Sequence, residues 1–149
     1  MDLDNLDDTE VQTLIDRLKH PIKEDMLNRI SNEINSLFLN LDLDEKIIDT
    51  EEIEYILHVY RGRIEKDRFS IHLRFKELHH HLVRIDINPS NNTHTNPDGT
   101  TISGSHIHIY SNHYSKKDII AIPLDKSNFP SIDNLYDAFV NFLDYNNIN

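Results

Sequence analysis

The spacing of apolar residues changes to a period of two near Ile53, and this change limits the folds open to the chain. Four segments beyond this point alternate apolar and polar residues, as half-buried β-strands do. They are residues 53–60, 69–76, 81–87 and 105–110. A shorter run at 119–124 predicts a fifth strand. Such alternation is typical of an antiparallel sheet with one face on a core and one face in solvent.

Segments with helical spacing precede the strands. Asp8 or Thr9 is predicted to cap a short helix that ends near His20, because Pro21 disfavours helix in the residue before it. A second helix is predicted to start at Pro21, since proline suits the first turn of a helix. Its apolar stripe continues to Leu41.

The rest of the chain completes a single fold. Residues 42–52 are acidic and are predicted to form a linker with a turn. Ser131 is predicted to cap a last helix that covers the apolar face of the sheet. A chain of 149 residues is long enough for one domain with a substantial core. We expect one α+β domain, helical over residues 1–52, with an antiparallel sheet of four to five strands and the last helix within residues 53–149.

The composition excludes several classes of protein. The chain has no cysteine, so it has no disulfide, no thiolate metal site and no Cys nucleophile. No apolar run reaches membrane-spanning length, and the first ten residues are acidic where a signal peptide is basic. We expect a cytoplasmic protein that does not contact membranes.

Charge is distributed unevenly along the chain. The formal net charge is -11, yet residues 58–84 carry seven bases and three acids. Nine of the ten histidines also lie between His58 and His113. A basic, histidine-rich region in an acidic protein suits a phosphate-bearing ligand, although a solvated sheet face would look similar. The strongly negative total argues against broad, nonspecific binding of nucleic acid.

The polar sides of the predicted strands concentrate residues that can perform chemistry. If the strands pair in sequence order, one surface receives His72, Arg74, Arg84, Asp86, His106, His108 and Tyr110. The loop at 88–104 contains His94 and is longer than a hairpin needs, and such loops are often functional. We expect this loop to fold over the end of the polar surface.

His106 and His108 are two residues apart on a strand, so both rings leave the same face, with Cα atoms about 6.5 Å apart. Two imidazoles at this spacing suit acid and base catalysis on one phosphodiester without a cofactor. His94 would assist, Arg74 and Arg84 would bind the phosphate, and Asp86 and Tyr110 would orient these groups. Alternatively, His94, His106 and His108 bind zinc and leave a fourth position for water. A purely structural role for the histidines is the third interpretation.

Several blocks of the sequence resemble one family. They are Arg84-Ile85-Asp86, His94-Thr95-Asn96-Pro97-Asp98-Gly99, His106-Ile107-His108-Ile109-Tyr110, Ala121-Ile122-Pro123-Leu124 and Phe142-Leu143-Asp144-Tyr145. Together they are similar to an uncharacterised group of small proteins from Gram-positive bacteria, their prophages and their mobile elements. Members of that group carry no assigned activity, so the resemblance implies a genomic setting and little chemistry.

Three functions therefore remain open. The first is a small metal-independent RNA phosphodiesterase, either toxin-like or phage-encoded, whose catalytic pair is His106 and His108. The second is a non-enzymatic binding protein of a phage or mobile element, such as an inhibitor of a host defence nuclease, whose acidic surface mimics nucleic acid. The third is a zinc-dependent hydrolase. The expected partners are accordingly RNA or another phosphate-bearing ligand, or a host defence protein.

Overall fold

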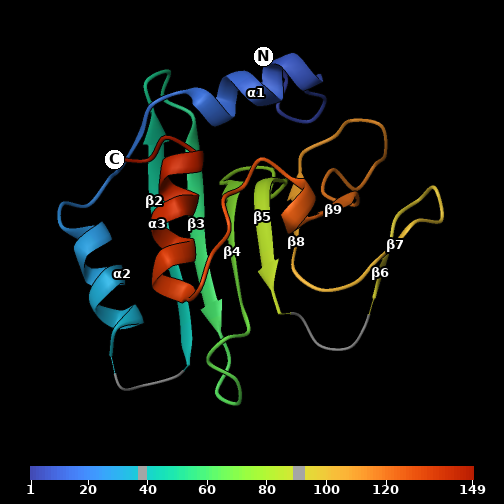
Figure 1. Cartoon of the computed structure of the whole chain (residues 1–149). Helices are drawn as coiled ribbons and strands as arrows, with labels where there is room; N and C mark the ends of the chain where they lie inside the picture. The colour runs from blue at the N-terminus through green and yellow to red at the C-terminus, as the bar shows by residue number, and fades with distance from the viewer. Residues whose placement is uncertain (37–39, 89–92) are drawn as a thin grey trace.

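The centre of the protein is an antiparallel sheet with three helices, seen here in a computed structural model that describes residues 1–36, 40–88 and 93–149 (Figure 1). The sheet has seven strands in the order β1-β2-β3-β4-β5-β8-β9, and β6 and β7 form a separate hairpin. The strands are β1 (Lys19–Pro21), β2 (Leu41–Asp49), β3 (Glu54–Arg61), β4 (Phe69–Phe75), β5 (His81–Ile87), β6 (His94–Thr95), β7 (Thr101–Ile102), β8 (His106–Ile109) and β9 (Ala121–Pro123). The helices are α1 (Asp8–Asp16), α2 (Met26–Ile34), α3 (Leu135–Tyr145) and the short 3-10 helix η1 (Leu124–Lys126).

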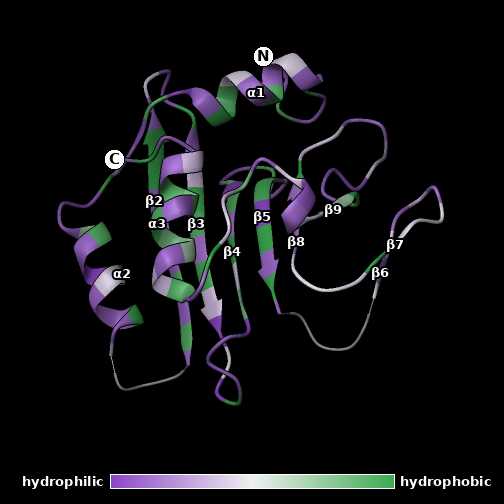
Figure 2. Cartoon of the chain, in the orientation of Figure 1, coloured by the Kyte–Doolittle hydropathy of each residue, from purple (hydrophilic) through white to green (hydrophobic). Residues whose placement is uncertain are grey.

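The core lies between the helices and one face of the sheet. Helix α3 contacts β4, α2 contacts β2, and α1 contacts β5 near the strand ends (Figure 1). Buried residues of all three helices and of the long strands belong to one apolar cluster. Along strands such as β5, apolar and polar residues alternate, as the green and purple bands in Figure 2 show. This alternation leaves the other face of the sheet polar. None of the helices in the described part of the chain is long and apolar enough to span a membrane.

The predicted α+β class with a large antiparallel sheet is confirmed, but the expected number of strands was too small. Residues 42–52 are not a linker, because most of them form β2. On β2, Leu41, Leu43 and Ile47 face the core and alternate with acidic or polar residues that face away. The high acidic content concealed this period of two. Strand pairing with β3 satisfies the backbone and overrides the poor strand propensity of Asp and Glu.

The second helix begins later than predicted, at Met26 and not at Pro21. Lys19–Pro21 forms the edge strand β1, where Pro21 loses no ladder hydrogen bond that a central strand would need. Helix α2 begins at Met26, and residues 37–39 of the predicted stripe lie outside the described residues. The interpretation of residues 1–52 as helical is therefore wrong, since β1 and β2 both lie within them.

The helix caps differ from the predicted ones by a few residues. Asp7 caps α1: its side chain accepts a hydrogen bond from the backbone N–H of Glu10, and the Glu10 side chain accepts one from Asp7. Asn134, and not Ser131, caps α3 by accepting from the N–H of Asp137 at 2.8 Å. Both caps satisfy amide groups that have no partner within the first helical turn.

Candidate functional site

Strand register gathers polar side chains into two rows across the open face of the sheet. In one row the Cα partners run Asp44, His58, His72, Arg84 and His108. In the next row they run Asp42, Tyr60, Ser70, Asp86 and His106. Residues opposite one another in antiparallel strands share a face, and so each row is a continuous strip of neighbouring side chains.

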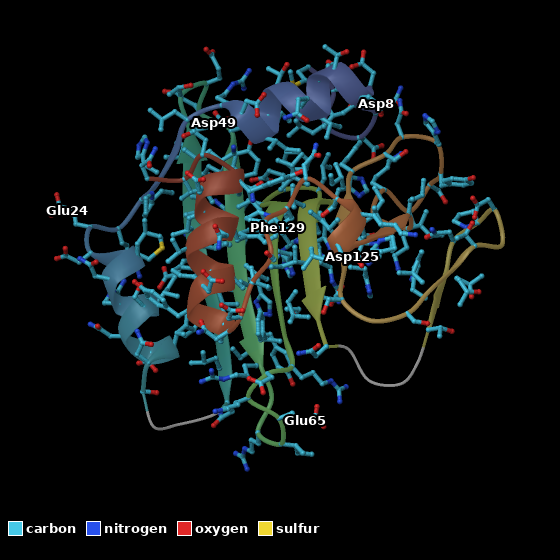
Figure 3. The ribbon with its side chains drawn as sticks, viewed as in Figure 1. Asp8, Glu24, Asp49, Glu65, Asp125 and Phe129 are labelled. Carbon is cyan, nitrogen blue, oxygen red and sulfur yellow. The ribbon has the colours of Figure 1, made fainter. Side chains whose placement is uncertain are left out.

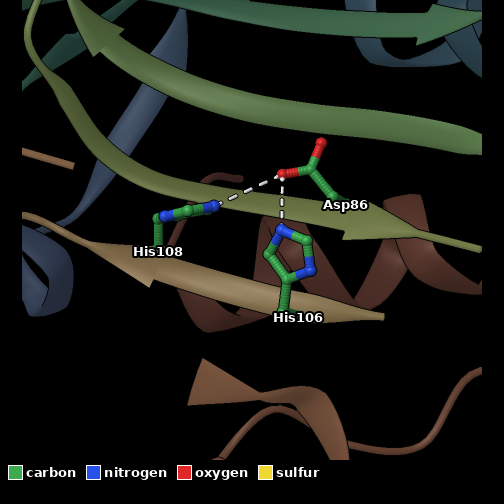
Figure 4. Close-up of side chains that lie close together, drawn as sticks. All are labelled: Asp86, His106 and His108. Atoms are coloured by element: carbon green, nitrogen blue, oxygen red, sulfur yellow. Dashed lines mark ion pairs between the residues drawn. The ribbon is translucent and has the colours of Figure 1, made fainter. Parts of the chain in front are cut away.

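Asp86 and His106 of the second row form a compact cluster with His108 of the first row. One oxygen of Asp86, Oδ2, lies 3.4 Å from His106 Nε2 and 3.6 Å from His108 Nε2 (Figure 4). The three ligating atoms all lie within 4.8 Å of one another. Each histidine is only 7% exposed, and Asp86 is half-buried. We call these three residues the Asp86 cluster.

The hydrogen bond of His106 to the backbone fixes the tautomer of a neutral ring. Its Nδ1 lies 2.9 Å from the carbonyl oxygen of Gly104, which can only accept, so Nδ1 donates. Gly104 has φ +78°, a conformation that glycine adopts without strain, and this turn aims its carbonyl at the ring. In a neutral ring, Nε2 then presents a lone pair to the carboxylate of Asp86. Two acceptors face each other here, so a cation must join them: a second proton on His106 or a metal ion bound to both.

His108 is held in a different environment from His106. Its Nδ1 is buried and has no hydrogen-bond partner in the part of the chain that the structure describes. Burial lowers the pKa of His108 to about 4, although the Asp86 carboxylate partly opposes this. The ring is therefore neutral near pH 7 and keeps a lone pair. A buried nitrogen without a partner destabilises a protein unless a ligand or a water molecule reaches it.

Asp86 and His106 shift each other's proton affinity in opposite directions. Burial alone would raise the pKa of Asp86, but His106 and Arg84 outweigh it and hold this pKa well below its usual range. The same contact with Asp86 raises the pKa of His106, against the effect of burial. Asp86 is therefore an anion at neutral pH, as a metal ligand must be.

The β6–β7 hairpin, which lies within the predicted loop at 88–104, brings His94 beside the cluster. The His94 ring centroid lies 5.1 Å from that of His108 and 5.9 Å from that of His106. Its Nε2 donates to the carbonyl of Ile119 at 2.7 Å, which leaves Nδ1 as the acceptor of a neutral ring. Residues 89–92 of the predicted loop lie outside the described residues.

Asn96 anchors this segment to the edge of the sheet. Its side-chain amide donates to the carbonyl of Ala121 at 2.9 Å, and its oxygen accepts from the N–H of Ala121 at 2.8 Å. The side chain thus satisfies the free edge of β9 in the way a further strand would. Asn96 is only 9% exposed, and it holds the hairpin arm, residues 93–102, at the sheet edge with His94 beside the cluster.

The two arginines predicted to bind phosphate lie in different places. Arg84 contacts Asp86 through two hydrogen bonds of 3.0 Å, from Nε and Nη2, and its side chain is 36% exposed. Arg74 lies instead beside His72, with Nη1 3.1 Å from the His72 Nε2 and 3.7 Å from a carboxylate oxygen of Asp44. Only Arg84 therefore contacts the Asp86 cluster.

Tyr110 does not orient the histidines, contrary to the sequence-based expectation. Strand β8 ends at Ile109, and the Tyr110 ring is 2% exposed in the core. Its hydroxyl donates to the carbonyl of Leu3 at 2.8 Å and accepts from the N–H of Leu6 at 3.3 Å. The period of two failed here because the strand stops one residue before Tyr110, and the ring turns toward the N-terminal segment.

Three further histidines form a stack that the sequence did not predict. The ring centroids of His58 and His72 lie 4.8 Å apart, and those of His72 and His81 lie 4.1 Å apart. Asp44 contacts His58 at one end of the stack, and Asp118 contacts His81 at the other. Burial, followed by the neighbouring imidazoles, lowers the pKa of His72 far below its usual value.

A bulge places His81 on the polar face of β5, although strict alternation would put it on the same side as the apolar Val83 and Ile85. Leu73 pairs with Val83, whereas Arg74 pairs with His81, so Leu82 is the extra residue in β5. Such an insertion reverses the side on which the preceding residues lie. His81 therefore joins the polar face, and Leu82 is fully buried in the core.

Comparisons with known proteins place the chain in a family without supplying an activity. No curated protein and no solved structure shows significant similarity to the chain. A family model, described as a family of unknown function, DUF6978, matches residues 6–148. The match extends over nearly the whole sequence, and the chain therefore belongs to the family of unknown function DUF6978.

Proposed function

We propose that the protein is a hydrolase that depends on a divalent metal ion, with the ion bound by Asp86, His106 and His108. The observation that carries this proposal is the convergence of two imidazole nitrogens on one carboxylate oxygen: His106 Nε2 and His108 Nε2 lie 3.4 and 3.6 Å from Asp86 Oδ2. A cation between these groups would relieve the repulsion between the nitrogen lone pairs of the two histidines and the carboxylate of Asp86. Imidazole and carboxylate are both ordinary ligands of zinc.

Two of the three separations within the cluster suit a metal ion. Zinc binds nitrogen and oxygen at about 2.0–2.2 Å, so two ligand atoms of a tetrahedral site lie about 3.4 Å apart. The two measured distances to Asp86 Oδ2 are 3.4 and 3.6 Å. Charge-assisted hydrogen bonds are shorter, about 2.7–2.9 Å. The backbone bond of His106 is also what a metal-binding histidine makes with its second nitrogen.

Three protein ligands suit catalysis because they leave a position for water. A bound zinc ion would lower the pKa of that water to about 7. His94 is close enough to act as a base, since its Nδ1 is an acceptor and its Nε2 is held by Ile119. Arg84, which is already bonded to Asp86, can bind an oxygen of a phosphodiester. With His94 as the base, water would give up a proton to His94 and form a bond to phosphorus as the bond to the leaving oxygen breaks, and the leaving oxygen would take up that proton.

A second candidate is the metal-independent RNA phosphodiesterase expected from the sequence. It is favoured by one observation: His106 and His108 approach the same Asp86 oxygen with ring centroids 4.9 Å apart and planes inclined by 79°. Two differently oriented imidazoles can reach opposite sides of one phosphate. In this scheme His106 is the acid and His108 the base, and no ion is required.

Metal analysis of protein purified without an affinity tag tests the main proposal. We expect about one zinc ion per chain in calorimetric titration. At zinc near 100 times Kd the folded state should gain about 2.7 kcal/mol. For a chain of this size this corresponds to about 5–11 °C in Tm. Titration with cobalt should give the visible absorption of a tetrahedral site.

Variants separate the Asp86 cluster from the other histidines. His108→Gln and His106→Gln should abolish the Tm shift, while His113→Gln should retain it, because His113 is exposed and lies outside the cluster. Hydrolysis of bis(p-nitrophenyl) phosphate should need zinc and stop in EDTA. Hydrolysis that persists in EDTA would favour the paired-histidine mechanism. Wild type that neither binds metal nor hydrolyses the ester, and that leaves single-stranded RNA intact in EDTA, would refute both enzymatic functions, and the non-enzymatic phage or mobile-element binding protein would replace them.

A further inference from the structure

We propose that the polar face of the sheet binds single-stranded nucleic acid along β5, across the Asp86 cluster. This inference rests on the proposed hydrolase, because it names the class of substrate that the same site would cleave. Two hollows carry it. One lies at each end of the polar side of β5, and Arg84 lines both of them.

The first hollow, of about 560 Å³, lies where the turn between β3 and β4 meets β5. Its lining includes Arg63, Arg68, Arg84 and Asp86, so it opens directly beside the Asp86 cluster. Arg63 and Arg68 are exposed, and neither forms an ion pair with any described residue. Glu65, labelled in Figure 3, marks the tip of the turn that carries both arginines. Guanidinium groups without a carboxylate partner are suited to phosphate.

The second hollow, of about 420 Å³, lies at the other end of β5, beside the segment that leads to β9. Lys116 and Lys117 line it together with Arg84 and the run His79 to His81. Asp118, the acidic residue of this lining, is engaged by His81 at 2.8 Å. A chain that passes from one hollow to the other would meet cations at both ends and the Asp86 cluster between them.

Charge distinguishes these two hollows from a third one. This third hollow, of about 780 Å³, is lined by Asp67, Asp125 and Asp133, with no lysine or arginine among its described residues. A polyanion would be repelled there. The two hollows on β5 are basic in a protein whose net charge is -11, so they are the places where a polyanion would be attracted.

Exposed aromatic and aliphatic side chains beside the arginines indicate that the ligand is single-stranded nucleic acid. Tyr60 is 46% exposed and Ile64 is 93% exposed, and both line the first hollow. Unpaired bases stack on aromatic side chains, and they do so with little regard to sequence. The bases of a duplex are already stacked on one another and offer no free face to Tyr60.

Fluorescence anisotropy with short labelled oligonucleotides tests the proposal. Its arms are single-stranded RNA, single-stranded DNA of the same sequence, and the corresponding duplex, each in EDTA and in zinc. We expect both single strands to bind, and the duplex to bind at least tenfold more weakly. Equal binding of the duplex would overturn the assignment to single strands. No binding of any oligonucleotide at low salt would overturn the whole inference.

A charge-matched pair of variants locates the binding. Arg63→Ala/Arg68→Ala should weaken binding and reduce the slope of log K against log salt by about 1.4, from two lost phosphate contacts. Lys23→Ala/Arg29→Ala removes the same charge from exposed positions away from the polar face and should leave the slope unchanged. Equal effects of the two pairs would mean that net charge alone drives binding, which contradicts a defined track.

Failure of this inference can be distinguished from failure of the proposed hydrolase. If zinc binds and the small phosphodiester is hydrolysed while no oligonucleotide binds, then only the substrate class is wrong. If the oligonucleotides bind in EDTA and zinc does not bind at all, the nucleic-acid track stands and the metal-dependent reaction fails. Loss of binding in Lys116→Ala/Lys117→Ala would show that the second hollow belongs to the track, and full binding in that variant would exclude it.

Discussion

Replacing Asn96 with alanine should release the hairpin arm from the edge of the sheet. The Asn96 side chain forms two hydrogen bonds, of 2.8 and 2.9 Å, with the backbone of Ala121. Each bond of this kind contributes about 0.5–1.5 kcal/mol net, so we expect the arm to lose about 1–3 kcal/mol. At 1.4 kcal/mol per factor of ten, this is about a 5- to 140-fold change in an opening equilibrium.

Hydrogen exchange measures this opening directly. In the wild type the amide of Ala121 should exchange slowly, because Asn96 Oδ1 accepts its hydrogen bond. In Asn96→Ala its exchange should accelerate by the same factor, while amides in β4 should be unaffected. Asn112→Ala is a suitable control, since Asn112 makes one exposed side-chain bond of 3.1 Å to Asn5. We expect less than about 0.5 kcal/mol there.

Unchanged protection of Ala121 in folded Asn96→Ala protein would refute this reasoning, because another group would then hold the arm. The result also affects the candidate site. The arm carries His94 to the Asp86 cluster, so its release should lower hydrolysis more than it lowers zinc affinity. A parallel loss of zinc binding would instead show that the arm shapes the metal ligands themselves.

Tyr110→Phe should lower the free energy of unfolding by about 1–2 kcal/mol, because it removes the hydroxyl that forms hydrogen bonds with the backbone of Leu3 and Leu6. Urea denaturation should show this loss, while the affinity for zinc should stay unchanged. Loss of zinc binding in this variant would restore the orienting role expected from the sequence. A second prediction concerns pH. Burial lowers the pKa of Lys19 to about 8, against 10.5 for the exposed group, although Asp49 partly opposes this. The unfolded chain therefore binds more protons between about pH 8 and pH 10.5, so the free energy of unfolding measured in EDTA should rise over this range. Lys19→Met should abolish the rise, and a flat wild-type profile would contradict the assignment.

The sequence predicted best those features that depend on neighbouring residues alone. The alternation in β3, β4 and β5 identified these strands, because successive side chains of a strand point to opposite faces. The same rule gave the common face of His106 and His108. It failed at β2, where Asp and Glu obscured the period, and at Tyr110, where the strand stops one residue earlier than expected.

Contacts between distant residues were beyond the reach of the sequence. Asn96 lies in a stretch that predicts a turn, and nothing local indicates that its amide bonds Ala121, 25 residues away. The partner of His81 is Asp118, and one extra residue at Leu82 decides that His81 faces it. In the sequence, Arg63 and Arg68 look like ordinary turn residues. Only the pairing of β3, β4 and β5 brings them beside Arg84.

By itself, then, the sequence determined the α+β class, the five strands of the main sheet after Ile53 and the histidine-rich polar face, because period and charge are properties of the local chain. Only the tertiary structure decided which of these histidines meet. Register places Asp86 opposite His106 and groups His58, His72 and His81 separately. Different surroundings then separate His106 from His108, because Asp86 raises the pKa of His106 whereas burial lowers that of His108. Both effects depend on pairing between segments that are far apart in the chain. Turns, bulges and packing together determine that pairing.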